Sequence, residues 1–104
     1  MAGFGLAGPQ TLTVNTASAL SLNNFTIDKP AGVALTLSGS QGVFNVAGAL
    51  RLAAGTLNDG GKIVNVTGNL FNSGLAAGTG RIVLNGSVAQ TIDGGGTFNN
   101  LELA

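Results

Sequence analysis

The chain has 104 residues, enough for one domain, and its four basic residues balance four acidic ones to a formal net charge of zero. It contains no His and no Cys, which excludes disulfides and zinc sites built from these residues, and it has no basic stripe that could follow a nucleic acid. Hydrophobic residues make up 44% of the chain and its mean hydropathy is +0.42, so a disordered chain is excluded as well.

Short segments of alternating apolar residues predict β-strands along most of the chain, and helical periodicity is almost absent. Gly, Asn and Asp punctuate these segments, as is typical of turns between strands. In chain order the alternating apolar residues are Leu12 and Val14; Leu20 and Leu22; Phe25 and Ile27; Val33, Leu35 and Leu37; Phe44 and Val46; Leu50 and Leu52; Val64 and Val66; Ile82 and Leu84; and Leu101 and Leu103. We therefore predict an all-β protein.

Residues 1–9 stand outside this pattern, and we predict an irregular N-terminal segment or cap there, followed by a single domain over residues 10–104. The first six residues have neither the charged start nor the long apolar centre of a signal peptide. No apolar run approaches the roughly 20 residues needed to span a bilayer, so we expect no membrane insertion.

The alternating segments repeat at a nearly constant spacing. Residues 45–50 align with residues 65–70 at an offset of 20, and the next copy aligns at 18, which places Val66 and Leu70 over Leu84 and Val88. A unit of this length with two or three short strands is typical of one coil of a β-solenoid, whose equivalent strands pair in parallel about 4.8 Å apart. We therefore predict a parallel β-solenoid (β-helix) of about five coils of roughly 20 residues, forming a rod roughly 25 Å long.

A longer repeat relates the two ends of the chain. Residues 22–27 resemble residues 98–103 at an offset of 76, and residues 10–12 resemble residues 90–92 at an offset of 80. This predicts one repeat unit of roughly 80 residues followed by the start of the next, with Asn23-Asn24 and Asn99-Asn100 at matching corners. It also predicts end-to-end stacking of molecules through Gln10, Thr11, Leu12, Leu22, Phe98, Leu101 and Leu103.

An antiparallel fold is the alternative, as a small β-sandwich or barrel. Asn85-Gly86, Asp59-Gly60 and Asp93-Gly94 are typical two-residue hairpin turns. The near-constant coil spacing favours the solenoid, because hairpins have no reason to repeat at one fixed interval.

The segment from Gly78 through Gln90-Thr91-Ile92 to Leu101 resembles repeats in very large secreted bacterial adhesin-like proteins. Those proteins are similar to filamentous haemagglutinins and autotransporter passengers, which form long β-solenoids. The resemblance covers about residues 10–104. It implies a structural or adhesive role at the cell surface or outside the cell, with an export signal that this chain does not contain, and it carries over no catalytic residues.

Groups that could carry catalysis are scarce. Nucleophilic catalysis usually needs a His or an activated thiol, and both are missing. Two carboxyl groups suffice for glycoside hydrolysis, but three of the four acidic residues lie beside Gly or Lys-Pro, where Asp is favoured for turn hydrogen bonds. Asp59 with Lys62 and Asp93 with Arg81 are the nearest acid–base pairs, and neither Asp lies in the repeated pattern of calcium-binding turns. We predict no enzyme activity, no metal and no cofactor.

Asn45 and Asn65 are predicted to stack in successive coils as a hydrogen-bonded ladder with a structural role. The five Phe residues alternate with Leu and Val, which favours core positions for all but Phe4 and leaves no aromatic platform for a sugar. Thr11-Leu12-Thr13 is the single Thr-x-Thr triplet, whereas ice binding needs regular rows of such triplets.

These observations predict a non-catalytic structural or adhesive segment whose main partner is a second copy of itself, stacked head to tail into filaments. A glycan or a host surface is a further candidate partner, and nucleic acid is not. The alternative function is a glycan-binding or ice-binding solenoid module.

Overall fold

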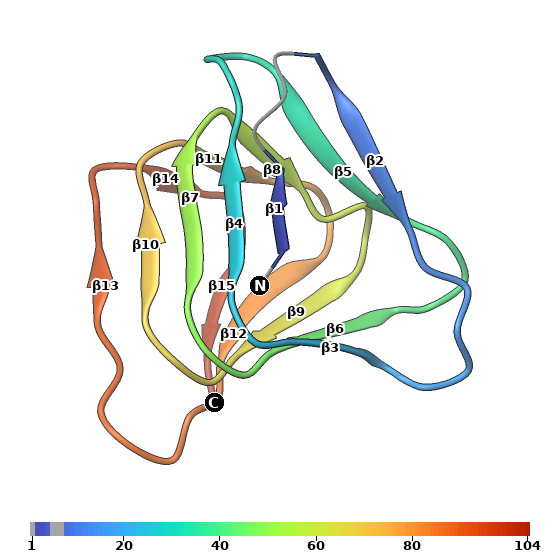
Figure 1. The fold of residues 1–104 in the computed structure, drawn as a ribbon. Coiled ribbons are helices and arrows are strands. Elements are labelled where there is room, and N and C mark those ends of the chain that lie inside the picture. The colour runs from blue at the N-terminus through green and yellow to red at the C-terminus, as the bar shows by residue number, and fades with distance from the viewer. Residues whose placement is uncertain (1, 5–7) are drawn as a thin grey trace.

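The computed structural model describes residues 2–4 and 8–104, and in this part of the chain three parallel sheets enclose one core (Figure 1). Sheet A contains β1 (Ala2–Phe4), β4 (Phe25–Asp28), β7 (Leu50–Ala54), β10 (Leu70–Asn72) and β13 (Ile92–Asp93). Sheet B contains β2 (Gln10–Thr13), β5 (Ala34–Ser38), β8 (Thr56–Asn58), β11 (Leu75–Ala77) and β14 (Thr97–Phe98). Sheet C contains β3 (Leu20–Leu22), β6 (Val43–Val46), β9 (Ile63–Val66), β12 (Arg81–Leu84) and β15 (Leu101–Leu103).

Consecutive strands belong to different sheets, and each strand pairs in parallel with the strands three positions away in the chain. One strand from each sheet therefore makes one coil, and each coil stacks on the coil before it. This confirms the predicted parallel β-solenoid of about five coils. The antiparallel alternative was wrong, because Asp59-Gly60 and Asp93-Gly94 form corners between sheets, with Gly60 at φ +61° and Gly94 at φ +95°, instead of hairpins.

The pairing register confirms the predicted repeat in the middle of the stack. Asn45 lies beside Asn65, and Leu50 beside Leu70. The next alignment is correct only in sheet C, where Val66 pairs with Leu84. In sheet A the partner of Leu70 is Ile92, not the predicted Val88.

Val88 is displaced because the connection from β12 to β13 is longer than the equivalent connection from β9 to β10. Gln90 stabilises this longer connection from within. Its side-chain carbonyl accepts a hydrogen bond from the Gly86 N–H at 2.7 Å, and its amide donates to the Val66 and Gly68 carbonyls of the coil below. Val88 is left 75% exposed at the tip.

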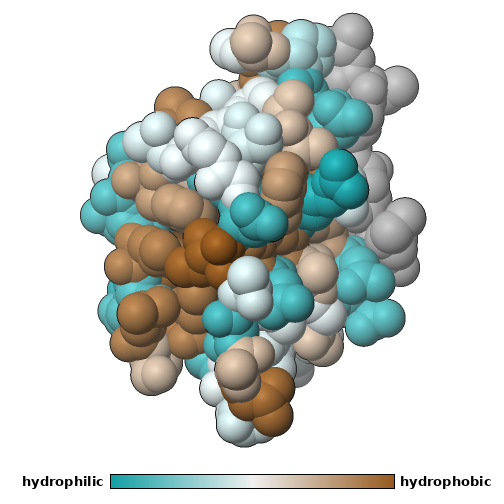
Figure 2. All heavy atoms as spheres, turned by 90° about the vertical axis from the view of Figure 1, so that its left-hand side faces the viewer, coloured by the Kyte–Doolittle hydropathy of each residue, from teal (hydrophilic) through white to brown (hydrophobic). Residues whose placement is uncertain are grey.

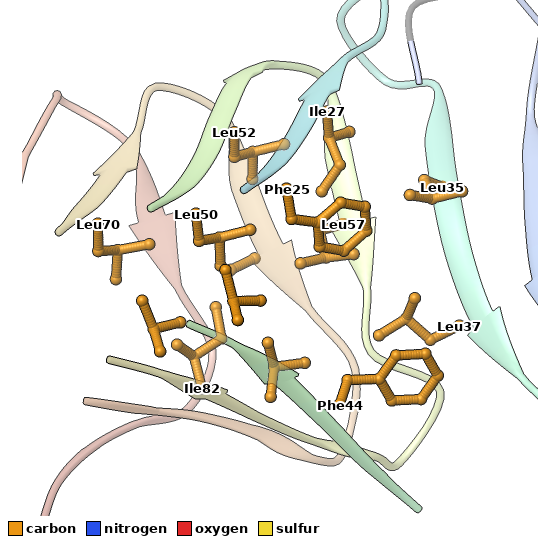
Figure 3. Packing of buried hydrophobic residues seen from close by; sticks show 14 of the residues in the cluster. Phe25, Ile27, Leu35, Leu37, Phe44, Leu50, Leu52, Leu57, Leu70 and Ile82 are labelled. Atoms are coloured by element: carbon orange, nitrogen blue, oxygen red, sulfur yellow. The ribbon is translucent and has the colours of Figure 1, made fainter. Parts of the chain in front are cut away.

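The core consists of the alternate side chains that point inward from all three sheets (Figure 3). Each position continues the same row from coil to coil: Phe25, Leu50 and Leu70 form one row, and Leu35 and Leu57 belong to another. These five side chains are at most 1% exposed. Because parallel neighbours lie about 4.8 Å apart, each apolar side chain packs directly on its equivalents, which explains why the alternation in the sequence repeats with the coil.

β1 lies within residues 1–9, for which the sequence predicted an irregular segment or cap, and it pairs with β4. The principal extents of the molecule are 35 × 34 × 25 Å. No helix in the described ranges is long and apolar enough to cross a membrane.

Candidate functional site

The predicted asparagine ladder is present between β6 and β9. The Asn65 side-chain amide donates a hydrogen bond to the Asn45 side-chain carbonyl at 3.0 Å, on the outer face of sheet C. The same row continues with Ser21 in β3 and with Val83 in β12, which offer no amide. The ladder is therefore two residues long and links the second and third coils.

The two Asn-Asn pairs lie at different corners of the coil. Asn23-Asn24 connects sheet C to sheet A, and the Asn24 side chain accepts a hydrogen bond from the Ala49 N–H at 3.0 Å. Asn99-Asn100 connects sheet B to sheet C, and the Asn100 amide donates to the Gly80 carbonyl at 2.9 Å. Each pair ties its own corner to the neighbouring coil, so the similarity between the two ends of the sequence relates strands that belong to different sheets.

The seven residues predicted to mediate end-to-end stacking all lie on strands at the two ends of the stack. Gln10, Thr11 and Leu12 are in β2, and Leu22 is in β3. Phe98 is in β14, and Leu101 and Leu103 are in β15. Among the described strands, each of these is the last in its sheet and has a neighbour on one side only. Its outer edge therefore carries backbone N–H and C=O groups without a strand partner.

The inward rows of the core continue into the last coil of the described chain, where several of their side chains are exposed. Ile92 extends the row of Leu50 and Leu70, yet it is 43% exposed. In sheet C, Leu101 and Leu103 extend the rows of Ile82 and Leu84, and they are 38% and 73% exposed, whereas Ile82 and Leu84 are buried. Figure 2 shows an apolar surface on the side of the molecule where β13 lies.

The first coil presents a less exposed apolar edge. Leu12, Leu20 and Leu22 are half-buried and pack against the core. The Gln10 side chain lies in the inward row of Leu35 and accepts a hydrogen bond from the buried Lys29 ammonium, which also donates to the Gly8 carbonyl at 2.9 Å. A polar cluster thus partly closes this end of the core.

The charged residues considered as acid–base pairs are engaged elsewhere. The buried Asp59 carboxylate accepts hydrogen bonds from the Gly61 N–H at 2.9 Å and from the Gly80 N–H at 2.8 Å. The Lys62 ammonium donates to the Gly39 carbonyl. Through these hydrogen bonds Asp59 joins two coils at the corner between sheets B and C, which is a structural role.

Arg81 and Asp93 are not brought together either. Arg81 lies on sheet C and forms an ion pair with Glu102 at 3.2 Å, while Asp93 lies on sheet A. Arg81 and Glu102 line a cavity of about 550 Å³ together with Thr79, Gly80, Asn99, Asn100 and Leu101. Among the described residues, no group of three or more acidic side chains comes together as a metal site would require.

The hydroxyl groups on sheet B form short rows. Thr11 pairs with Thr36, and Thr13 pairs with Ser38, so four outward hydroxyl residues lie in two adjoining strands. The row of Thr36 then continues with Asn58 and Ala77. A regular hydroxyl lattice therefore does not extend beyond two coils on this face.

Sequence reasoning missed a mixed row on the outer face of sheet A. Arg51, Phe71 and Asp93 are direct neighbours in β7, β10 and β13. The prediction that Phe71 belongs to the core was wrong, because Leu70 and Asn72 on either side of it point inward and are buried. A signal was available, since the alignment that places Leu50 over Leu70 also places Arg51 over Phe71.

The row borders a shallow pocket of about 310 Å³. The Arg51 guanidinium carbon lies 5.2 Å from the centroid of the Phe71 ring, a cation–π contact that orients both side chains. Asn69 and Thr91 lie at the rim, where the Asn69 side-chain carbonyl accepts a hydrogen bond from the Thr91 N–H at 2.9 Å. An aromatic ring, a cation, an anion and an amide thus surround one hollow.

Comparison of the chain with protein-family models, with curated proteins and with solved structures found no match.

Proposed function

We propose that this chain is a non-catalytic structural segment that stacks head to tail with further copies of itself, as part of an extracellular or cell-surface adhesive protein. The observation that carries the proposal is the continuation of the inward apolar rows into Ile92, Leu101 and Leu103, which are 38–73% exposed among the described residues. The cell-surface location rests on the sequence resemblance to adhesin-like repeats.

The geometry of the rows supports a specific docking arrangement. If the stack continues in register, Leu101 and Leu103 of one molecule lie on Leu20 and Leu22 of the next, because these residues occupy the same two rows of sheet C. The exposed edge of β15 would gain a parallel strand partner at the same time. The same contact repeats at every junction, and since it joins opposite ends of the molecule it propagates as a filament.

The free energy gained by burying these end side chains is small, so we expect weak assembly. Full burial of a Leu or Ile side chain contributes about 1.5–3 kcal/mol, and Ile92, Leu101 and Leu103 are only 38–73% exposed before docking. Association costs about 4–15 kcal/mol in lost translational and rotational freedom. We therefore expect stacking that depends strongly on protein concentration.

The test compares two variants with the same charge change at nearly equal exposure. Leu103→Asp places a carboxylate on the proposed interface at a side chain that is 73% exposed, and Val88→Asp places one at a side chain that is 75% exposed in the connection after β12. Sedimentation velocity and negative-stain electron microscopy over a concentration series measure assembly. We expect elongated assemblies for the parent chain and for Val88→Asp, and single particles for Leu103→Asp. Single particles of the parent chain at every concentration, or equal assembly of both variants, would refute the proposal.

A further inference from the structure

The pocket on sheet A has the chemistry of a binding site for an uncharged sugar. A pyranose ring presents C–H groups on its faces and hydroxyl groups around its rim, so a protein site for it combines an apolar surface with separate hydrogen-bond donors and acceptors. Phe71 supplies the apolar surface, Arg51 supplies donors, and Asp93 supplies acceptors, all from adjacent strands. We propose that this pocket binds one neutral hexose residue of a glycan.

Asp93 and Arg51 can form further hydrogen bonds at the pocket. Asp93 uses one carboxylate oxygen to accept a hydrogen bond from the Gly94 N–H at 2.8 Å. In the described part of the chain, the Arg51 guanidinium contacts the Phe71 ring and forms no ion pair. Arg51 has five N–H donors, and its contact with the aromatic ring supplies no oxygen acceptor for any of them. Ligand hydroxyl groups can therefore pair with both side chains without breaking contacts that hold the fold.

The charges select the class of ligand. One cation and one anion border the same hollow, so their charges cancel and neither a phosphate nor a carboxylate ligand is favoured over a neutral one. The volume of about 310 Å³ lies at the lower end of small-molecule pockets and suits a single sugar ring. The larger cavity beside Arg81 is a poorer candidate, because Arg81 and Glu102 already pair with each other there.

The pocket lies on the outer face of sheet A, whereas the proposed stacking contact buries the inward rows at the end of the stack. Arg51 and Phe71 lie on β7 and β10, and Asp93 lies on the edge strand β13, in a different sheet from the strand β15 that carries Leu103. The same pocket would recur along the side of a filament, and recurrence of weak sites raises the overall affinity for a polymeric glycan. The Leu103→Asp variant changes sheet C and leaves the pocket residues of sheet A unchanged, so it allows sugar binding to be tested apart from assembly.

The experiment is an NMR titration of the ¹⁵N-labelled Leu103→Asp variant with the methyl glycosides of glucose, galactose and mannose. At least one glycoside is expected to shift the amide resonances of residues 69–71 and 91–93. Phe71→Ala is expected to weaken that binding at least about tenfold, and Asp93→Asn about tenfold, because a charged acceptor becomes a neutral amide. Asp28→Asn is the matched control, since Asp28 is an exposed carboxylate on the same sheet but outside the pocket.

Two results would overturn the proposal. The first is the absence of resonance shifts at the pocket with all three glycosides. The second is a binding event that Asp93→Asn and Asp28→Asn affect equally. Asp93 is exposed, so its substitution leaves the fold intact even if Phe71→Ala should prove unstable. Because the titration uses a variant impaired in stacking, a negative outcome here does not bear on self-assembly.

Discussion

A methyl group added at Gly68 tests how closely the coils approach one another. At the corner between sheets C and A, the Gly68 N–H donates a hydrogen bond to the Gly48 carbonyl at 2.9 Å. A Cβ atom at position 68 would lie 2.3 Å from that carbonyl oxygen and 2.6 Å from its carbon, both far inside van der Waals contact. The Gly68→Ala variant can fold only if the two corners separate.

Two contributions set the loss of stability expected for Gly68→Ala. Overpacking by one carbon costs about 1–3 kcal/mol, and the corner hydrogen bond lost in the separation contributes about 1 kcal/mol. We therefore expect Gly68→Ala to lower the free energy of unfolding by about 2–4 kcal/mol. For a chain of this size that corresponds to a fall in Tm of roughly 10–20 °C.

The control is Gly42→Ala, because a Cβ atom there would meet nothing within 4 Å and Gly42 is not among the glycines with positive φ. This substitution should leave stability unchanged or raise it by up to about 1 kcal/mol, since Ala restricts the unfolded chain. Circular dichroism at about 218 nm, the usual wavelength for β-structure, followed during thermal and urea unfolding gives both values. A Tm for Gly68→Ala within about 2 °C of the parent chain would refute the stacked-corner geometry.

Two further substitutions test the core and the corner at Asp59. Phe44→Ala should lower the free energy of unfolding, measured in urea, by about 3–5 kcal/mol, because Phe44 is fully buried between Leu20 and Val64 in its row. The exposed control Val88→Ala should change it by less than about 0.5 kcal/mol, and equal effects of the two variants would contradict the assignment of the core. Asp59→Ala should lower the free energy of unfolding by about 2–3 kcal/mol, because it leaves the Gly61 and Gly80 N–H groups without their acceptor, whereas Asp59→Asn keeps an acceptor and should lower it less. Thermal unfolding that ranks the two variants in the opposite order would contradict the role of Asp59 in joining the two coils.

Much of the coil could be predicted from the alternation of residues. Within residues 44–46 and 64–66, every second side chain is apolar, and a strand places alternate side chains on opposite faces. The equal spacing of these segments then predicts that like residues stack. Asn45 and Asn65 follow directly, because they are equivalent positions on the outer face of neighbouring coils.

The same reasoning failed where the length of a connection matters. Similarity between residues 22–27 and 98–103 suggested equivalent corners, yet these segments span different corners of the coil. Similarity between two short sequence segments indicates that each contains a strand next to a turn. It does not indicate how many strands lie between the two segments. The longer connection before β13 likewise moved Val88 out of the row that its spacing predicted.

The sequence by itself determined that this chain forms short parallel strands in stacked coils, since period-two alternation and a nearly constant repeat length admit few other ways to bury the apolar side chains. The tertiary structure decided which strands share a sheet, and thereby which residues meet. It brought Arg51, Phe71 and Asp93 together over one pocket, and it left Ile92, Leu101 and Leu103 uncovered at the end of the rows they extend. The physical reason is that contacts between coils depend on register, which is set by the lengths of the corners and by the position of each strand in its sheet.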